Sequence, residues 1–364
     1  MPTLKKIVVQ DYRNIAFQEI EFSPNVNCIS GSNGEGKTNL LDAVHYLSMT
    51  KSAFPVQDRY NIRYGASGFV LAGTYRMPSG VESRFSVRFS SGEKKLLRDD
   101  KPYERISDHI GLLPVVMISP GDISLVSESG EERRRFTNAV LSQMDREYLR
   151  ALQQYNRLLL QRNSLLREGS VDDGLIAVMD ERMEACAAPL VQARRSFVRD
   201  LSPIVSEYYR LISGGAEQVS IEYRTDLDKG SLREILRARL DKDLALGFTG
   251  AGLQRDELLF SLDDHPIRRA GSQGQQKSFL VALKFAQYDI MRKSYGYAPM
   301  LLLDDVFDKL DLDRTANLIG MVAGKDFGQI FITDCDKVRL RTIVDSITDE
   351  SAYFDTVAGV FTRA

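Results

Sequence analysis

The chain has 364 residues and a mass of 41.0 kDa, which is more than a single hydrophobic core usually accommodates, so we expect two lobes. Its 48 lysines and arginines and 50 aspartates and glutamates give a formal net charge of −2, which excludes a uniformly basic nucleic-acid binder but allows a local basic patch. The apolar run at 112–118 is too short to cross a bilayer, and residues 1–10 lack the apolar core of a signal peptide, so we expect a cytoplasmic protein without a membrane partner.

The N-terminal part begins with strand patterns that lead to a phosphate-binding motif. Residues 4–22 read as two strands, and the apolar run 26–29 suits a buried strand. A helical pattern follows at Leu40, Leu41, Val44 and Leu47. Between strand and helix, the pattern Gly-x4-Gly-Lys-Ser/Thr is matched by Gly31, Ser32, Asn33, Gly34, Glu35, Gly36, Lys37 and Thr38.

This phosphate loop predicts a polyphosphate site that uses Mg²⁺. Glycines let the backbone curl so that several N–H groups converge on the phosphates, and the following helix adds its positive end. Lys37 would reach the β- and γ-phosphates, and the Thr38 hydroxyl would ligate Mg²⁺. A glycine turn that binds nothing is the alternative, and the strand and helix on either side disfavour it.

Residues 1–121 are predicted to form the N-terminal part of this nucleotide-binding lobe. Residues 69–104 suggest an antiparallel meander with a turn at Ser91 and Gly92. Its alternating apolar residues are Phe85, Val87 and Phe89. Another apolar strand is expected at 112–119, before Pro120 and Gly121.

The pattern changes after residue 121. Residues 122–213 carry long amphipathic stretches, which predict helices. Residues 219–223 return to a strand pattern, and 232–246 read as one helix. We therefore expect 122–248 to be a mainly helical lobe with a short β segment.

Residues 249–364 are expected to form the C-terminal part of the nucleotide-binding lobe. After a strand at 258–262, the segment 271–364 alternates helix and strand, as a parallel sheet requires. The apolar strand 300–303 runs directly into Asp304 and Asp305, which places two carboxylates at the ligand-binding edge of such a sheet. Asp304 is predicted to hold Mg²⁺ and Asp305 to orient or deprotonate the attacking water. Two exposed acids in a turn are the alternative.

Another motif, at residues 271–277, opens a predicted helix. Ser272 and Gln275 have the spacing of a capping box, which explains both residues without a ligand. A capped helix start is also an anion site, so Ser272, Gly274 and Gln275 are candidates to contact a γ-phosphate. The two interpretations coexist.

These motifs together resemble the bacterial RecF proteins, ATPases of the ABC class that are related to the structural-maintenance-of-chromosomes ATPases. The resemblance rests on the phosphate loop, the strand that ends in two aspartates, and further similar segments at 119–122, 131–136, 249–257, 272–276 and 308–311. It implies an α/β fold, namely an ABC-type P-loop ATPase head with a mixed β-sheet lobe and an inserted helical lobe. It also implies that the nucleotide is ATP, bound with Mg²⁺.

The function that the resemblance implies is an ATP-driven homodimer that clamps DNA. The phosphate loop of one subunit would face Ser272, Gly274 and Gln275 of the other, with Asp311 near the interface. Lys37, Asp305 and Ser272 are then the expected catalytic residues of a weak ATPase. The dimer would hold double-stranded DNA near single-stranded gaps and, with RecR and RecO, help load a RecA-type recombinase in recombinational repair and replication-fork maintenance. Slow hydrolysis would reset the clamp.

Arginines in the helical lobe are candidates to neutralise DNA phosphates, which would make binding strongly dependent on salt. For any one of them, a solvated helix face is the alternative. The set consists of Arg133, Arg134, Arg135, Arg150, Arg157, Arg162, Arg194 and Arg195.

The chain departs from the family pattern at Gln254, where members commonly have histidine, and at Gly121, where an acidic residue is usual. It has neither a Q-loop glutamine within 112–122 nor a switch histidine within 331–334. The shared signature leaves the ATPase subunit of an ABC-type transporter as an alternative, although the missing glutamine and the helical arm argue against it. A GTPase or small-molecule kinase is disfavoured because the guanine-reading motif Asn/Thr-Lys-x-Asp is absent.

Overall fold

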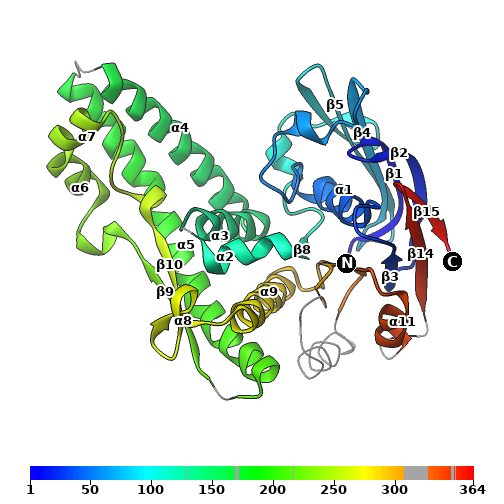
Figure 1. The fold of residues 1–364 in the computed structure, drawn as a ribbon. Helices are drawn as coiled ribbons and strands as arrows, with labels where there is room; N and C mark the ends of the chain where they lie inside the picture. Colours follow the sequence, from blue (N-terminus) through cyan, green and yellow to red (C-terminus); the bar gives the residue numbers. More distant parts are fainter. Residues whose placement is uncertain (129, 169–171, 216, 307–326, 346–347, 349) are drawn as a thin grey trace. The chain divides into compact units, whose positions relative to one another are not determined.

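The computed structural model describes residues 1–128, 130–168, 172–215, 217–306, 327–345, 348 and 350–364 (Figure 1). The chain divides into two compact units. Unit 1 consists of Met1–Ile123, Leu211–Ser213 and Lys284–Ala364, and unit 2 of Ser124–Arg210 and Gly214–Leu283. Among these described residues, no helix combines the length and apolarity that crossing a membrane requires.

The first sheet of unit 1 is antiparallel and contains the predicted meander. Its strands are β1 (Thr3–Tyr12), β2 (Ile15–Glu21), β4 (Gly68–Arg76), β5 (Glu82–Ser90), β6 (Glu93–Arg98) and β7 (Lys101–Pro102), in the order β2-β1-β4-β5-β6-β7. Phe85, Val87 and Phe89 on β5 are buried, as their alternation predicts. The meander expected at 69–104 is confirmed.

The second sheet of unit 1 is mostly parallel. Its strands are β3 (Val26–Ser30), β8 (Val115–Ile118), β12 (Met300–Asp304), β13 (Ile330–Asp334), β14 (Ser351–Val357) and β15 (Val360–Arg363), in the order β15-β14-β3-β13-β12-β8. Every residue of β3, β8, β12 and β13 is buried, which explains their continuous apolar patterns. The C-terminal segment differs from the expected parallel alternation, because β15 turns back and pairs antiparallel with β14.

Helix α1 (Lys37–Met49) follows the phosphate loop and packs against strands of both sheets, including β4 and β12. Leu40, Leu41, Val44 and Leu47 are fully buried, so the helical spacing read from the sequence marks the buried side of a helix that lies between two sheets (Figure 1). Unit 1 also contains α11 (Lys337–Asp345), which contacts β3 and β13.

Unit 2 is mainly helical, with a small sheet. Its larger helices are α3 (Gly130–Met144), α4 (Arg146–Glu168) and α5 (Asp173–Ser213), with short α2 (Ser124–Ser127) and α8 (Ile267–Ala270). The sheet has the order β11-β10-β9, from β9 (Val219–Arg224), β10 (Glu257–Leu262) and β11 (His265–Pro266). Residues 232–246, expected as one helix, form α6 (Leu232–Ala238) and α7 (Leu240–Leu246), because Arg239 leaves the helical conformation with φ −106° and ψ 1°. Helix α9 (Gln273–Tyr295) begins in unit 2 and continues into unit 1.

The division differs from the expected one at residues 249–283, which the sequence placed with the nucleotide-binding lobe. In the structure they belong to unit 2. The physical reason is their pairing: β10 forms a ladder with β9, and Glu257 and Asp256 bind Arg133 and Arg194.

Candidate nucleotide-binding site

The phosphate loop joins β3 to α1 through backbone conformations that favour glycine. Gly34 has φ 86° and Gly36 has φ 107°, and Gly36 is the N-cap of α1. Both values lie in the left-handed region, where side chains are strained. The predicted order of buried strand, glycine loop and helix is confirmed, and α1 begins directly at Lys37.

The Lys37 side chain lies within the loop rather than in solvent. Lys37 is 3% exposed, and its Nζ donates to the carbonyl oxygens of Gly31 at 2.7 Å and Ser32 at 3.1 Å. The ammonium group is therefore already held at the loop that the sequence assigns to phosphate. Phosphate oxygens would compete with these two carbonyls for the same donor.

Thr38 and Asp304, which lie far apart in the sequence, meet beside the loop. The Thr38 Oγ1 lies 2.9 Å from each carboxylate oxygen of Asp304. Asp304 is 2% exposed at the end of β12, and this burial raises the pKa of its carboxyl to about 6, against the effect of hydrogen bonds from Thr333 and Thr38. A hydroxyl and a carboxylate are the oxygen donors that Mg²⁺ prefers, so this pair fits the ion.

Thr333 joins the two aspartates and was not identified from the sequence. Its Oγ1 donates to Asp304 Oδ1 at 2.8 Å and accepts from the backbone N–H of Asp305 at 3.0 Å. Asp305 itself has φ 45°, a left-handed conformation that this hydrogen bond supports. The place of Thr333 opposite Asp304 depends on the parallel register of β12 and β13, which no local pattern shows.

Ser272 and Gln275 form the hydrogen bonds of a capping box at the start of α9. The Ser272 N–H donates to Gln275 Oε1 at 2.6 Å, and the Gln275 N–H donates to Ser272 Oγ at 3.3 Å. Gln275 also donates through Nε2 to Glu217. Ser272, Gly274 and Gln275 belong to unit 2 and the phosphate loop to unit 1, so their role toward nucleotide stays a prediction. Asp311 and the rest of segment 308–311 lie outside the described residues.

Three of the arginines assigned to a DNA-facing surface are internal. Arg133, Arg162 and Arg194 are 5%, 0% and 3% exposed. Arg133 Nε donates to Glu257 at 2.8 Å, and Arg194 is paired with Asp256. A charged residue on an amphipathic pattern can be buried when a carboxylate from a distant segment meets it, and here that pairing excludes the three side chains from an exposed basic surface.

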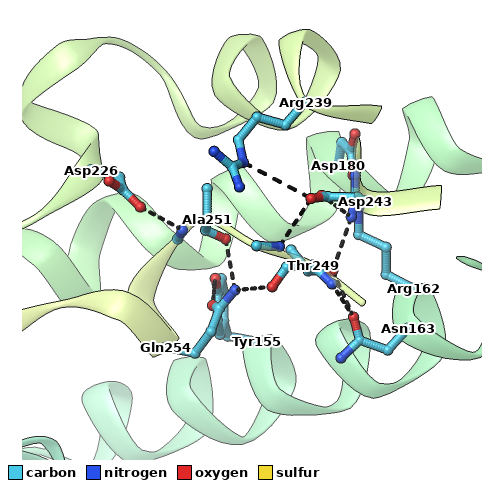
Figure 2. Close-up of polar contacts among 12 residues, drawn as sticks. Tyr155, Arg162, Asn163, Asp180, Asp226, Arg239, Asp243, Thr249, Ala251 and Gln254 are labelled. Atoms are coloured by element: carbon cyan, nitrogen blue, oxygen red, sulfur yellow. Dashed lines mark hydrogen bonds and ion pairs between the residues drawn. The ribbon is translucent and has the colours of Figure 1, made fainter. Parts of the chain in front are cut away.

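The segment 249–256, which lies within the stretch 249–257 of the family resemblance, is fixed to the helices of unit 2. Figure 2 shows Arg162 bonded to Asp180 Oδ1 at 2.7 Å, Asp243 Oδ2 at 3.0 Å and Thr249 Oγ1 at 2.9 Å. Gln254, at the position of the usual histidine, accepts from the Tyr155 hydroxyl at 2.8 Å (Figure 2). In this chain, residue 254 therefore supports the loop through hydrogen bonds.

The carboxyl end of this segment meets the other similar stretch. Arg133 and Arg134, within 131–136, bind the Glu257 carboxylate and the Asp256 carbonyl oxygen, respectively. Two separate parts of the family resemblance are thus explained by one structural junction in unit 2.

Comparison with protein families and sequences gives close relatives. A family model described as an AAA domain matches residues 6–170. The DNA replication and repair protein RecF of Bacteroides fragilis is 42% identical over 358 residues, which covers 98% of this chain and 97% of the relative. That of Parabacteroides distasonis is 42% identical over 356 residues and covers 98% of both.

Solved structures agree in fold. A structure described as the recombination mediator protein RecF-ATP in the RecFOR pathway matches with a TM-score of 0.89 and 27% identity, over 100% of this chain and 98% of that one. An Smc head domain from Pyrococcus furiosus matches with a TM-score of 0.58 and 16% identity, over 100% of this chain and 96% of that one, which supports the ABC-type ATPase fold alone. The near full-length identity of 42% places the chain in a family, and that family is the RecF proteins.

Proposed function

We propose that the chain is an ATP-dependent DNA-binding protein of replication and recombinational repair that acts in the cytoplasm. The observation that carries the nucleotide part is the convergence of Lys37, Thr38 and Asp304 at one loop. The DNA part is supported by the relatives, which are named DNA replication and repair proteins. The alternative of a transporter subunit shares the ABC-type signature, but the relatives at 42% identity are named for DNA replication and repair.

The proposed chemistry assigns separate roles to the residues of the loop. The loop N–H groups and Lys37 bind the β- and γ-phosphates of ATP, and Thr38 and Asp304 would hold Mg²⁺. When bound, the ion supplies positive charge that stabilises the phosphate oxygens during transfer. Asp305 orients the attacking water and accepts its proton, and Thr333 holds Asp305 in place through the backbone N–H. We propose slow turnover, as a switch that resets by hydrolysis requires.

We further propose that ATP joins two copies of the chain. In this arrangement Ser272 and Gly274 of one subunit contact the γ-phosphate held by the other, so nucleotide binding stabilises the dimer by mass action. The closed dimer clamps double-stranded DNA near single-stranded gaps and, with RecR and RecO, helps load a RecA-type recombinase. Hydrolysis reopens it.

The proposed DNA contacts include the arginines of the predicted set that the structure leaves exposed, among them Arg135, which pairs with Glu131 and Glu132 on the surface. Arg150, Arg157 and Arg195 lie on the surface of unit 2, and Arg255 extends from the end of the fixed segment 249–256. Arg150 and Arg195 have carboxylate partners, Glu147 and Asp228, on the exposed surface. Surface pairs of this kind contribute little, so DNA phosphates can displace them.

The experiment that tests the proposal measures solution mass with and without ATP·Mg²⁺, and then with a short duplex at two salt concentrations. We expect an ATP-dependent dimer that retains the duplex better at low salt. Lys37→Ala should remove nucleotide binding, whereas Asp305→Asn should bind ATP and remain dimeric for longer. A monomer under all conditions, or parental hydrolysis by Asp305→Asn, would contradict the proposal.

A further inference from the structure

Glu35 is the one acidic residue of the phosphate loop, and its side chain is bound by a distant segment. The hairpin of β14 and β15 supplies three donors to this residue, one from the end of β14 and two from the turn. The N–H of Ala358 donates to the Glu35 carboxylate, the N–H of Gly359 donates to the Glu35 carbonyl oxygen at 2.8 Å, and Thr356 Oγ1 donates to the same oxygen at 3.2 Å. One residue of the loop is thus held through both its side chain and its backbone.

Two close backbone contacts of this hairpin require glycine, one with the phosphate loop and one with the turn between β1 and β2. A Cβ on Gly31 would lie 2.6 Å from the Thr356 carbonyl oxygen, which no real Cβ tolerates. A Cβ on Gly359 would lie 2.5 Å from the carbonyl oxygen of Asn14. Gly31 therefore serves the packing of the C-terminal hairpin as well as the curvature of the loop.

The turn between β1 and β2 also holds the loop. Asn14 Nδ2 donates to the Gly34 carbonyl oxygen at 3.4 Å, and Asn39 Nδ2 donates to Asn14 Oδ1 at 2.7 Å. A Cβ on Gly36 would lie 2.7 Å from Asn14 Oδ1. Residues of two different turns therefore support the loop, and its shape does not depend on its own sequence alone.

We infer that Glu35, Thr356, Ala358 and Gly359, here called the turn clasp, hold the phosphate loop in the shape that accepts a nucleoside triphosphate. The inference rests on the proposed ATP binding and adds a positioning residue, Glu35, to it. A loop that is ordered before binding loses less conformational freedom when the phosphates arrive, so affinity rises. The Ala358 N–H also donates to the Glu35 carboxylate. This hydrogen bond holds the negative charge of Glu35 against the hairpin, where it repels the phosphates less than a free carboxylate in the loop would.

The two effects of the carboxylate make opposite predictions, which gives a sharp test. If the clasp dominates, Glu35→Ala weakens ATP binding about tenfold or more, because a hydrogen bond to a charged group is lost and the loop is loosened. Glu35→Gln keeps an acceptor for Ala358 and should stay within about threefold of the parent. If charge repulsion dominates, both variants bind ATP more tightly, and the inference is wrong.

The measurement is the dissociation constant of ATP·Mg²⁺ by titration calorimetry, with thermal unfolding of the nucleotide-free protein beside it. Glu82→Ala is the matched control, since it removes an exposed carboxylate of unit 1 that pairs with Lys5. We expect the control to bind like the parent and Glu35→Ala to unfold within a few degrees of it. Unchanged affinity in Glu35→Ala would overturn the clasp.

A second variant keeps the test valid if Glu35→Ala folds poorly. Thr356→Val removes one hydroxyl bond to Glu35 and should weaken ATP binding, while Thr356→Ser should restore it. Equal affinities of the Val and Ser variants would contradict the inference. Lys37→Ala separates the two proposals: if it binds ATP like the parent, the proposed nucleotide site fails, and if it alone loses binding, only the clasp fails.

Discussion

Thr333 occupies the position where one hydroxyl controls both aspartates at the end of β12. Its single proton is directed to Asp304, and its lone pair accepts the N–H of Asp305. The donor and acceptor roles cannot be exchanged, because a carboxylate oxygen only accepts and an N–H only donates. Thr333 thus connects the backbone of Asp305 to the carboxylate of Asp304, the residue proposed to bind Mg²⁺.

We expect Thr333→Val to lower the rate constant of ATP hydrolysis about tenfold or more with little change in ATP affinity. Valine has the same shape but leaves the Asp305 N–H and one Asp304 oxygen without this partner. Thr333→Ser should keep most of the activity. Steady-state hydrolysis that separates kcat from KM measures the effect, and a pure change in KM would show that Thr333 acts on binding instead.

The buried ring of His109 makes the stability of the fold depend on pH. Its Nε2–H donates to the Leu47 carbonyl oxygen at 2.6 Å, and its Nδ1 lies 3.2 Å from the Tyr103 hydroxyl, which can donate to Nδ1 when the ring is neutral. Burial lowers the pKa of His109 from 6.5 to about 4. The stabilisation by the neutral ring is therefore complete above about pH 6.5 and is lost as the pH falls toward 4, by at most about 3 kcal/mol.

His109→Gln should make the free energy of unfolding less dependent on pH between 6.5 and 4, as measured by urea unfolding at several pH values. His265→Gln is the control, because His265 is exposed on β11. Parallel pH curves for parent and His109→Gln would show that other groups cause the acid sensitivity.

The residues of the candidate site were predictable from sequence to the extent that local spacing places them. Lys37, Thr38 and Asp304 follow from a loop pattern and a strand that ends in acids. Thr333 and the partners of Glu35 were not predictable, since they depend on which strands become neighbours. The burial of Arg162 was missed for the same reason. The sequence of α4 shows only a charged residue, whereas the two carboxylates that pair with it, Asp180 and Asp243, come from α5 and α7.

At the scale of elements, α4 carries two arginines that look alike in sequence and differ in the structure. Arg162 is fully buried between α5, α7 and the segment 249–256, whereas Arg157 is exposed. Burial raises the pKa of the Asp180 carboxyl, and the hydrogen bond and positive charge of Arg162 act in the opposite direction. Arg162 and Asp180 stabilise the fold only as a pair, because either charge alone would be buried without a counter-ion.

We expect Arg162→Met to lower the free energy of unfolding by about 3 to 5 kcal/mol, because it leaves Asp180 and Asp243 without their buried counter-ion. Arg157→Met should change it by less than about 0.5 kcal/mol. Denaturant unfolding of both variants checks the difference. Equal stabilities would mean that water or rearrangement replaces the guanidinium.

Most elements with strong patterns were predicted, and the exceptions include the helix break at Arg239 and the direction of β15. The break at Arg239 contains neither glycine nor proline, so nothing local announces it. There the Arg239 guanidinium approaches Asp243, and the N–H of Gly250 donates to the same carboxylate at 3.1 Å. The direction of β15 likewise follows from the tight turn at Ala358, which has φ 49°, and Gly359.

At the scale of the whole molecule, the proposed dimer gives a prediction that separates ATP binding from assembly. Ser272→Arg places a long cation where the partner nucleotide is proposed to lie, so it should spare ATP binding by the monomer and prevent the ATP-driven rise in mass. Ser272→Asn retains an oxygen that can cap α9 and is the control for loss of the cap. Light scattering with and without ATP·Mg²⁺ measures the result. A parental mass shift in Ser272→Arg would exclude the proposed contact across subunits.

The position of β3 in its sheet has a consequence for the order in which the protein is made. Val26–Ser30 lies between β13 and β14, and its partners Ile330–Asp334 and Ser351–Val357 follow the whole of unit 2 in the chain. On the ribosome, β3 stays unpaired while unit 2, built from nearly continuous sequence, already has its own contacts. The phosphate loop acquires both supporting turns only when β14 and β15 have been synthesised. The proposed nucleotide site is therefore complete only after the hairpin of β14 and β15 has been synthesised.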